Sequence, residues 1–346
     1  MPRNFLNKPN LLGRTASMAI RLVDYVLPTC CALCHQTIKQ DHAQTNTWLC
    51  HSCQPYLDAL RLTDARLTDV CQQCAIPLEP SHTLVTTQND INNTNKLPNS
   101  LSNNLSNNLS SNRANHQASE HNVKLCASCL KFPPAYTAIK CLYLYGYPLD
   151  NLINTCKEKN QPAIAHHLGV ELANAFFTQT STHNQLNDKH INEKHNIFTQ
   201  DTLITSVPIH PKKWLIRQYN PAHIMALSAI KHAVKTMEKN AIHAAQKSDT
   251  KKITPNTKNI TYHYRSNLLI KNTMTHTQKG LNRKARLKNL ENSFSFNQYY
   301  SAKDKHIIVI DDVVTTTATA HIISSLLKKH GAKTITFYAI ARTPKS

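Results

Sequence analysis

Two adjacent carboxylates and a run of hydroxyl side chains are the residues of this sequence best suited to chemistry. Asp311 and Asp312 follow the unbroken apolar run 307–310, which is typical of a strand buried on both faces of a parallel sheet. A loop between such a strand and a helix N-terminus binds anions, because unpaired N–H groups and the positive helix dipole meet there. The predicted phosphate loop consists of Val313, Val314, Thr315, Thr316, Thr317, Ala318 and Thr319.

The residues after this loop predict a helix and a further strand. An apolar stripe continues to Leu327, Gly331 suits the position just past the helix end, and residues 334–341 are rich in strand formers. No lysine follows a glycine-rich loop, so the Walker pattern of nucleoside triphosphate sites is absent. Two acids before a phosphate loop suit a ribose 5-phosphate, which carries a phosphate and vicinal hydroxyls. The alternative is a buried strand followed by an ordinary threonine-rich turn.

Eight of the eleven cysteines form four C-x-x-C pairs, which favours metal binding in a reducing compartment over disulfides. Two such pairs complete a closed tetrahedral site, so four pairs predict two structural zinc ions. Sequential pairing joins the first two pairs on one ion and the last two on the other, while interleaved pairing stays open. Thiol redox chemistry is the alternative. The predicted ligands are Cys31, Cys34, Cys50, Cys53, Cys71, Cys74, Cys126 and Cys129.

Five residues near this pattern are expected to have no role as ligands. His35 and His51 adjoin the metal sites, but four thiolates per ion are already available, so they are interpreted as surface neighbours. Cys30, Cys141 and Cys156 are expected to be buried structural thiols.

The composition indicates a strongly basic protein without a membrane span. The formal charge of the 346 residues is +20, and eight thiolates with two Zn²⁺ would lower it to about +16. Such a charge suits nucleic acid or a highly anionic small substrate. No secretory signal and no stretch of transmembrane length is evident, so a cytoplasmic protein is expected.

The sequence divides into three expected parts. Residues 1–27 form an N-terminal segment, and 28–131 form a double zinc ribbon interrupted at about 81–123 by a low-complexity, disordered insertion. An α/β domain with a parallel sheet and helices on both faces is expected over 132–346, with polar insertions at about 181–200 and 239–262.

Within the α/β domain, several elements can be placed by their pattern. A strand is expected over 138–147, helical structure over 148–177, and a second buried strand over 202–210. A basic turn, 211–217, follows that strand, and Asn220 is expected to cap a helix running to about residue 238. The turn contains Lys212, Lys213 and Arg217, which suit a pyrophosphate, although lysines in turns are more often simply solvated.

Taken together, the cysteine ribbons, the strand 202–210 and the acidic motif resemble the ComF/GntX family of competence proteins, over about residues 18–80 and 124–344. The resemblance implies a type I phosphoribosyltransferase-like fold that binds phosphoribosyl pyrophosphate (PRPP) with Mg²⁺. Asp311 and Asp312 would contact the ribose hydroxyls, the phosphate loop would hold the 5-phosphate, and the basic turn would face pyrophosphate. The family usually has glycine where this chain has Thr317, and Arg-Gly-Phe-Asn-Gln where it has residues 217–221.

A further segment resembles the loop that covers the site in phosphoribosyltransferases. The matching residues are Thr275, Gln278, Arg283, Arg286 and Asn289. A basic, solvated helix is the alternative for this segment.

The resemblance implies one function and leaves one rival. The first is a PRPP-binding, Mg²⁺-dependent phosphoribosyltransferase, a glycosyltransferase, connected with DNA uptake in competence. The rival is a non-catalytic module of the same fold that binds single-stranded DNA or the uptake machinery. The sequence leaves open whether the protein is an enzyme, and it identifies no acceptor substrate.

Overall fold

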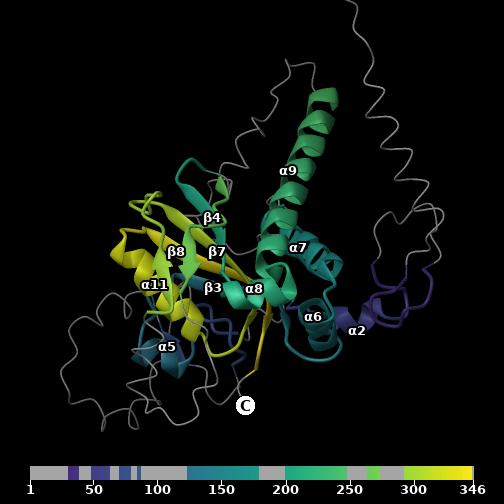
Figure 1. Cartoon of the computed structure of the whole chain (residues 1–346), viewed down its shortest axis with the longest axis horizontal. Helices are drawn as coiled ribbons and strands as arrows, with labels where there is room; N and C mark the ends of the chain where they lie inside the picture. The colour runs from purple at the N-terminus through teal and green to yellow at the C-terminus, as the bar shows by residue number, and fades with distance from the viewer. Residues whose placement is uncertain are drawn as a thin grey trace, which may run out of the picture.

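The computed structural model describes residues 30–38, 48–62, 70–78, 84–86, 123–178, 199–247, 263–272 and 292–344. Four parallel strands in the order β3-β8-β7-β4 form its central sheet (Figure 1). They are β3 (Ala138–Leu144), β4 (Thr202–Ser206), β7 (His306–Val314) and β8 (Thr334–Arg342). The predicted α/β class with a parallel sheet is therefore confirmed. The expectations for residues 1–27, the segment 275–289 and nearly all of the insertion 81–123 lie outside the described residues.

Helices cover both faces of this sheet. On one face lie α6 (Leu149–Glu158), α7 (Pro162–Phe176) and α9 (Pro221–Lys247), and on the other lies α11 (Ala318–Lys329). Side chains alternate across a strand, so Ile308 and Ile310 of β7 pack into the first core, while Ile307 and Val309 pack into the second. This two-sided burial is what the unbroken apolar run predicted.

The register of the sheet decides where a site can form. Ser206, the last residue of β4, pairs with Ile310 of β7, and Val314, the last residue of β7, pairs with Arg342 of β8. The loops after these strands therefore leave from the same edge of the sheet. In open parallel sheets this carboxyl edge is where ligands bind.

Shorter elements complete the described structure. They are α2 (Gln54–Asp58), β1 (Leu84–Thr86), β2 (Val123–Leu125), α5 (Ala127–Lys131), α8 (Pro211–Arg217), β5 (Leu269–Lys271) and β6 (Phe294–Phe296). β1 pairs with β2 and β5 with β6, both antiparallel. No helix among the described residues is long and apolar enough to cross a bilayer.

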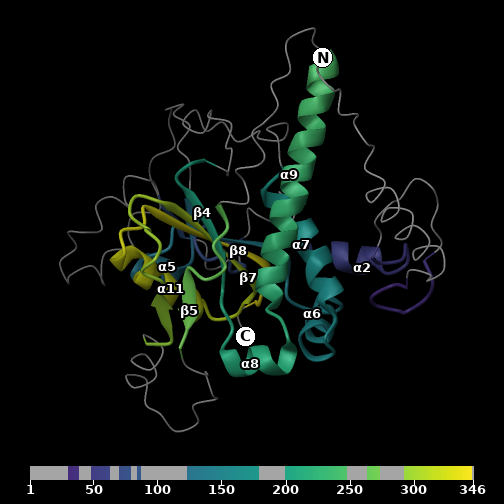
Figure 2. The ribbon, with the colours of Figure 1, turned by 45° about the horizontal axis from the view of Figure 1, so that its top comes forward.

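Several predicted boundaries differ from the structure. The helical stretch 148–177 is two helices, because Asn160 adopts a positive φ of 55° after α6 and Pro162 starts α7. The strand expected over 202–210 ends at Ser206, and the basic turn is the short helix α8 at the lower end of α9 (Figure 2). Helix α9 continues to Lys247, into residues expected to be a polar insertion, since alanines there favour helix.

Candidate metal centres and anion-binding cleft

The structure groups the eight C-x-x-C cysteines into two tetrads by the sequential pairing. Within each tetrad all four Sγ atoms lie within 4.8 Å of one another. Cys31, Cys34, Cys50 and Cys53 form the first tetrad, and Cys71, Cys74, Cys126 and Cys129 form the second. Both contain cysteines from two separate C-x-x-C turns, as a closed structural site requires.

The spacing of the sulfur atoms fits a tetrahedral ion. A Zn–S bond of about 2.3 Å places two sulfurs of a tetrahedron about 3.8 Å apart. The Sγ atoms of Cys34 and Cys50 are 3.7 Å apart, as are those of Cys74 and Cys126, whereas a disulfide would need about 2.05 Å. Both tetrads could therefore hold a metal ion, and their all-thiolate donor sets are consistent with zinc.

The first C-x-x-C turn of each tetrad has the same backbone structure. His35 and Ala75, directly after the second cysteine, have φ angles of 59° and 57°. Their N–H groups donate to the Cys31 and Cys71 carbonyls at 2.9 and 2.8 Å. In both tetrads the first sulfur also accepts an N–H from the partner turn, at 3.4 Å in the first and 3.3 Å in the second. The two four-cysteine units, called the first knuckle (the tetrad of Cys31) and the second knuckle (the tetrad of Cys71), are thus structural repeats. In the sequence only the cysteine spacing reveals this.

The neighbours of the cysteines follow the expectations with one exception. His35 and His51 are exposed and belong to neither tetrad. Cys141 and Cys156 are buried at 3% and 1% exposure. Cys30 is exposed, so its predicted burial was wrong: it lies at the outer end of the first knuckle, bridged to Thr37, rather than in a core.

A cleft of about 230 Å³ opens at the carboxyl edge of the sheet. Its two acids lie at the end of β7, and its cations come from α6, α8 and β5. The lining residues are Lys157, Val207, Pro208, Ile209, His210, Lys213, Arg217, Asn220, Ala222, Lys271, Asp311 and Asp312. The acidic pair and part of the basic turn, about a hundred residues apart in sequence, thus face the same space.

The two carboxylates occupy different environments. Asp312 pairs with Lys157 of α6 at 2.9 Å, and its N–H donates to the Asp311 carboxylate at 2.9 Å. Burial, together with the charge of Asp312, raises the pKa of Asp311 to about 7. This concentration of negative charge is a suitable place for a divalent cation, which favours carboxylate oxygens.

The basic residues divide into those in the cleft and those outside it. Lys213 and Arg217, one turn apart on α8, line the cleft, and Lys212 does not. The Arg217 Nε donates to the Lys157 carbonyl at 2.8 Å, which ties α8 to α6. Burial and the charge of Lys213 lower the pKa of Lys271. Several cations forced close together in this way would be stabilised by an anion.

The phosphate loop lies directly beyond the acids but does not line the cleft. Thr315 and Thr316 are exposed, Val313 is half-buried and Val314 is buried, and Ala318 and Thr319 begin α11. Thr317 caps α11 in the left-handed conformation, with φ 59°, and Gln218 ends α8 with φ 66°. These are the two positions where the resemblance expected glycine, so the backbone keeps the conformation that glycine tolerates best.

Sequence reasoning missed two cations of the cleft, Lys157 and Lys271. Lys157 follows Ile153 by four residues on α6, so it continues a buried stripe and could have been placed on the inner face. Lys271 offered no comparable signal.

The predicted cap at Asn220 is confirmed, because its Oδ1 accepts the Ala222 N–H at 3.1 Å while its Nδ2 donates to the Val207 carbonyl at 2.9 Å.

Fold and site together define an α/β protein with a parallel sheet, a mixed-charge cleft at its carboxyl edge and two four-cysteine knuckles. No family model matches the chain. It is 24% identical over 226 residues to DNA utilization protein YhgH of Escherichia coli K12, covering 64% of this chain and 80% of that protein. It is 27% identical over 221 residues to Competence protein F of Haemophilus influenzae, covering 63% and 78%. These relatives support the ComF family for this chain, as the sequence motifs predicted.

Proposed function

We propose that the protein binds PRPP with Mg²⁺ in the cleft, and that it is a phosphoribosyltransferase-fold protein linked to DNA uptake in competence. The observation that carries this proposal is the meeting of the Asp311–Asp312 pair with Lys213 and Arg217 in one cleft. PRPP needs such a mixture, because its ribose offers hydroxyls and its pyrophosphate a dense negative charge. The names of the relatives, a DNA utilization protein and a competence protein, support the link to DNA uptake.

Each group of the ligand has proposed partners. The two aspartates accept hydrogen bonds from the ribose hydroxyls, and residues 313–319 hold the 5-phosphate. Lys213 and Arg217 face the pyrophosphate, and Lys212, which precedes Lys213 on α8, adds positive charge outside the cleft lining. Mg²⁺, when bound, would neutralise part of the pyrophosphate charge.

The proposed chemistry needs little covalent help from the protein. In a transfer reaction the bond between ribose C1 and pyrophosphate breaks, an acceptor attacks C1, and positive charge develops on the ribose. Lys213 and Arg217 would stabilise the departing pyrophosphate, and the carboxylates would stabilise the developing charge by preorganised electrostatics. The same residues serve a binding module equally well if no acceptor enters.

Isothermal titration with PRPP and Mg²⁺ tests this proposal. The wild-type protein should bind, and the Asp311→Asn/Asp312→Asn variant should not, because it keeps the shape of the cleft but removes its negative charge. Asp201→Asn is the matched control, since Asp201 is an exposed acid paired with Lys305 at 2.7 Å, away from the cleft. Wild-type protein that binds no PRPP, or a double variant that binds it normally, would contradict the proposal.

A second candidate function, binding of single-stranded DNA, is favoured by helix α8. Trp214, Leu215 and Ile216 expose 49%, 63% and 83% of their surface on α8, between the cleft-lining residues Lys213 and Arg217. An exposed aromatic ring beside lysines can stack on a base while the cations hold the backbone. Trp214→Ala should weaken binding of a fluorescent oligonucleotide by about 1–3 kcal/mol. The control is Tyr299→Ala, 96% exposed and outside the cleft; equal losses in both variants would contradict a role for α8.

The expected division at residue 131 into a ribbon region and a phosphoribosyltransferase-like region is also proposed. The division is one of sequence rather than of folding unit, because cysteines of the second tetrad pack in the same core as the sheet. Limited proteolysis should therefore release no sheet that stays folded alone, and a stable fragment starting near Phe132 would show instead that the second region folds independently.

A further inference from the structure

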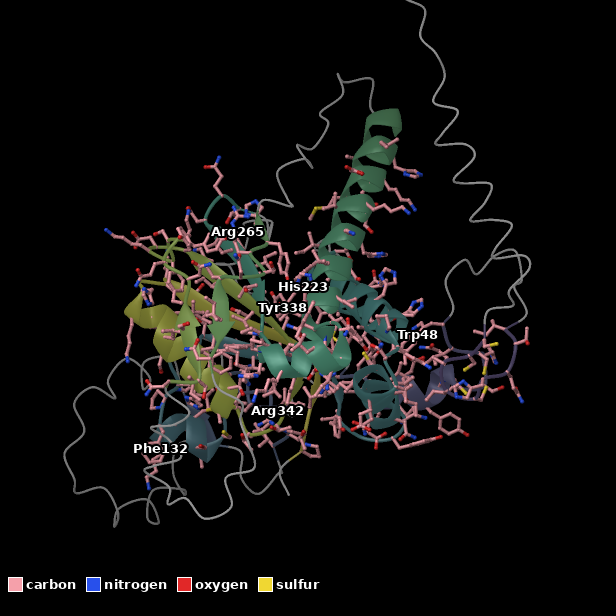
Figure 3. The ribbon with its side chains drawn as sticks, in the orientation of Figure 1. Trp48, Phe132, His223, Arg265, Tyr338 and Arg342 are labelled. Atoms are coloured by element: carbon pink, nitrogen blue, oxygen red, sulfur yellow. The ribbon has the colours of Figure 1, made fainter. Side chains whose placement is uncertain are left out.

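A buried arginine joins the second cysteine tetrad to the phosphate loop. Arg342, the last residue of β8, is 3% exposed (Figure 3). Its Nε donates to the carbonyl of Cys74 at 3.0 Å. Its Nη1 donates to the carbonyls of Val314, at 2.9 Å, and of Thr315. One guanidinium therefore holds a metal-site residue and the first part of the loop.

The charge of Arg342 requires compensation, because a buried cation without a counter-charge is strongly unfavourable. Among the described residues no carboxylate forms an ion pair with it. Its partners are backbone carbonyls, one of which belongs to a predicted zinc ligand. Four thiolates around Zn²⁺ carry a net charge of about −2, so a metal-loaded second tetrad supplies the missing negative charge.

The same hydrogen bonds orient the phosphate loop. In a trans peptide the C=O and the following N–H point in opposite directions. Because Arg342 holds the Val314 and Thr315 carbonyls inward, the N–H groups of Thr315 and Thr316 must point away from it. Neither N–H has an acceptor among the described residues, and both side chains are exposed. The loop thus presents two unpaired donors outward, as phosphate binding requires.

We propose that Arg342 is a positioning residue that makes the shape of the phosphate loop depend on metal in the second tetrad. The first tetrad is the natural contrast, because among the described residues no hydrogen bond joins it to the loop. In the test below, the measurement of PRPP affinity rests on the proposed anion site, whereas the measurement of hydrogen exchange in the loop does not.

Arg342→Lys tests the proposal without removing the charge, because an ammonium lacks the fork that reaches the carbonyls of Cys74, Val314, Thr315 and Thr343. Hydrogen exchange at two backbone amides reports on the conformation of the loop. The Thr343 N–H donates to the Val314 carbonyl at 3.1 Å, and the His321 N–H donates to the Thr317 carbonyl at 2.9 Å. Both amides should exchange about ten-fold faster or more in the variant. Zinc content should stay unchanged, and PRPP affinity should fall about ten-fold.

Arg61→Lys is the matched control, because Arg61 is a partly buried arginine that bonds Tyr143 and Glu171 and makes no contact with the loop. It should leave both amides at the wild-type rate. Wild-type exchange in Arg342→Lys, or equal acceleration in Arg61→Lys, would overturn the proposal.

The metal dependence is tested by single serine substitutions in the full chain. Cys74→Ser should accelerate exchange at Thr343 and His321, and Cys34→Ser should not. Equal effects of the two would overturn the coupling. If Cys74→Ser fails to fold, Arg342→Lys decides alone through the same two amides. If the wild type binds no PRPP, the proposed function fails while the exchange result still decides the role of Arg342.

Discussion

The two cysteine knuckles have nearly the same local structure and very different surroundings. The first packs on the α6–α7–α9 side, where Trp48 stacks on His167 of α7 with ring centroids 5.4 Å apart (Figure 3). The second packs on the α11 side, where the Ile139 N–H of β3 donates to Gln73 at 2.8 Å. In the first unit only the segment after the cysteines, residues 60–62, is hydrogen-bonded to β3, whereas in the second the C-x-x-C turn itself is hydrogen-bonded to β3 through Gln73.

Burial follows the same division. Cys34 of the first tetrad is exposed and Cys50 and Cys53 are half-buried, whereas three of the four cysteines in the second tetrad are buried. Cysteine spacing thus determines whether a metal ion can be bound, whereas the residues packed around each tetrad determine which other parts of the fold depend on that ion.

The largest contrast is expected from removal of each metal site. Cys71→Ser/Cys74→Ser should lose one zinc ion and lower the free energy of unfolding by more than about 4 kcal/mol, because the second tetrad is part of the sheet's core. Cys31→Ser/Cys34→Ser should also lose one of about two zinc ions per chain, but keep the sheet folded. Elemental analysis and denaturant unfolding measure both results.

Two results would contradict these expectations. Protein purified without chelator that contains no zinc would refute the metal sites. Equal destabilisation by the two double variants would refute the difference between the knuckles.

The anchor of the first knuckle is expected to matter next. Trp48 is 6% exposed, and Trp48→Ala should destabilise the protein by about 3 kcal/mol through the lost packing. PRPP titration should give the wild-type affinity, since the cleft receives no contact from Trp48. Loss of PRPP binding in a folded Trp48→Ala variant would show that the first knuckle also supports the cleft.

The two sides of the sheet should also respond oppositely to pH. Burial, together with the charge of neighbouring His166, lowers the pKa of His167 to about 4, so between about pH 6.5 and 4 the unfolded chain binds more protons than the folded one. Stability from this site is therefore lost as the pH falls through that window. His167→Gln should flatten this part of the unfolding-versus-pH curve, and an unchanged curve would contradict the assignment.

At the acidic pair, the stability of the fold should change with pH in the opposite direction. The pKa of Asp311, raised to about 7, means that the folded chain binds more protons between about pH 4 and 7, so stability falls as the pH rises there. Mg²⁺–PRPP binding needs the carboxylate and should strengthen over the same range. Asp311→Asn should remove the slope in stability, and affinity that is independent of pH in the wild type would contradict a role for Asp311.

The smallest effect is expected at two residues with a left-handed backbone conformation. Thr317 lies at the start of α11, on the side of the second knuckle, and Gln218 lies at the end of α8. Thr317→Gly should stabilise the protein by about 1 kcal/mol or less, because relief of β-branched strain exceeds the entropy cost of glycine. It should also tighten PRPP binding by letting the backbone approach the phosphate. Gln218→Gly is the control, with a smaller gain expected. Weaker PRPP binding by Thr317→Gly would instead identify the Thr317 hydroxyl as a phosphate donor.

The features predicted from the sequence were those with a local or periodic signal. The run 307–310 gave a two-sided strand, Asn220 and Pro221 gave the start of α9, and the cysteine pairs gave two tetrads. Element ends were less reliable, as the extension of α9 shows, because nothing in a polar, alanine-containing stretch marks where a helix stops.

The types and spacing of the cysteines, and of Asp311 and Asp312, were enough to predict two four-cysteine clusters and an acidic pair at the end of a buried strand. The tertiary structure alone decided which groups meet: Lys157 with Asp312, Lys213 with Lys271, and Arg342 with both Cys74 and Thr315. Arg342 has no sequence signal, because a charged residue at the end of a strand is ordinarily solvent-exposed. It is buried here because the second knuckle covers that end of the sheet and supplies a carbonyl acceptor, a long-range contact that no local pattern encodes.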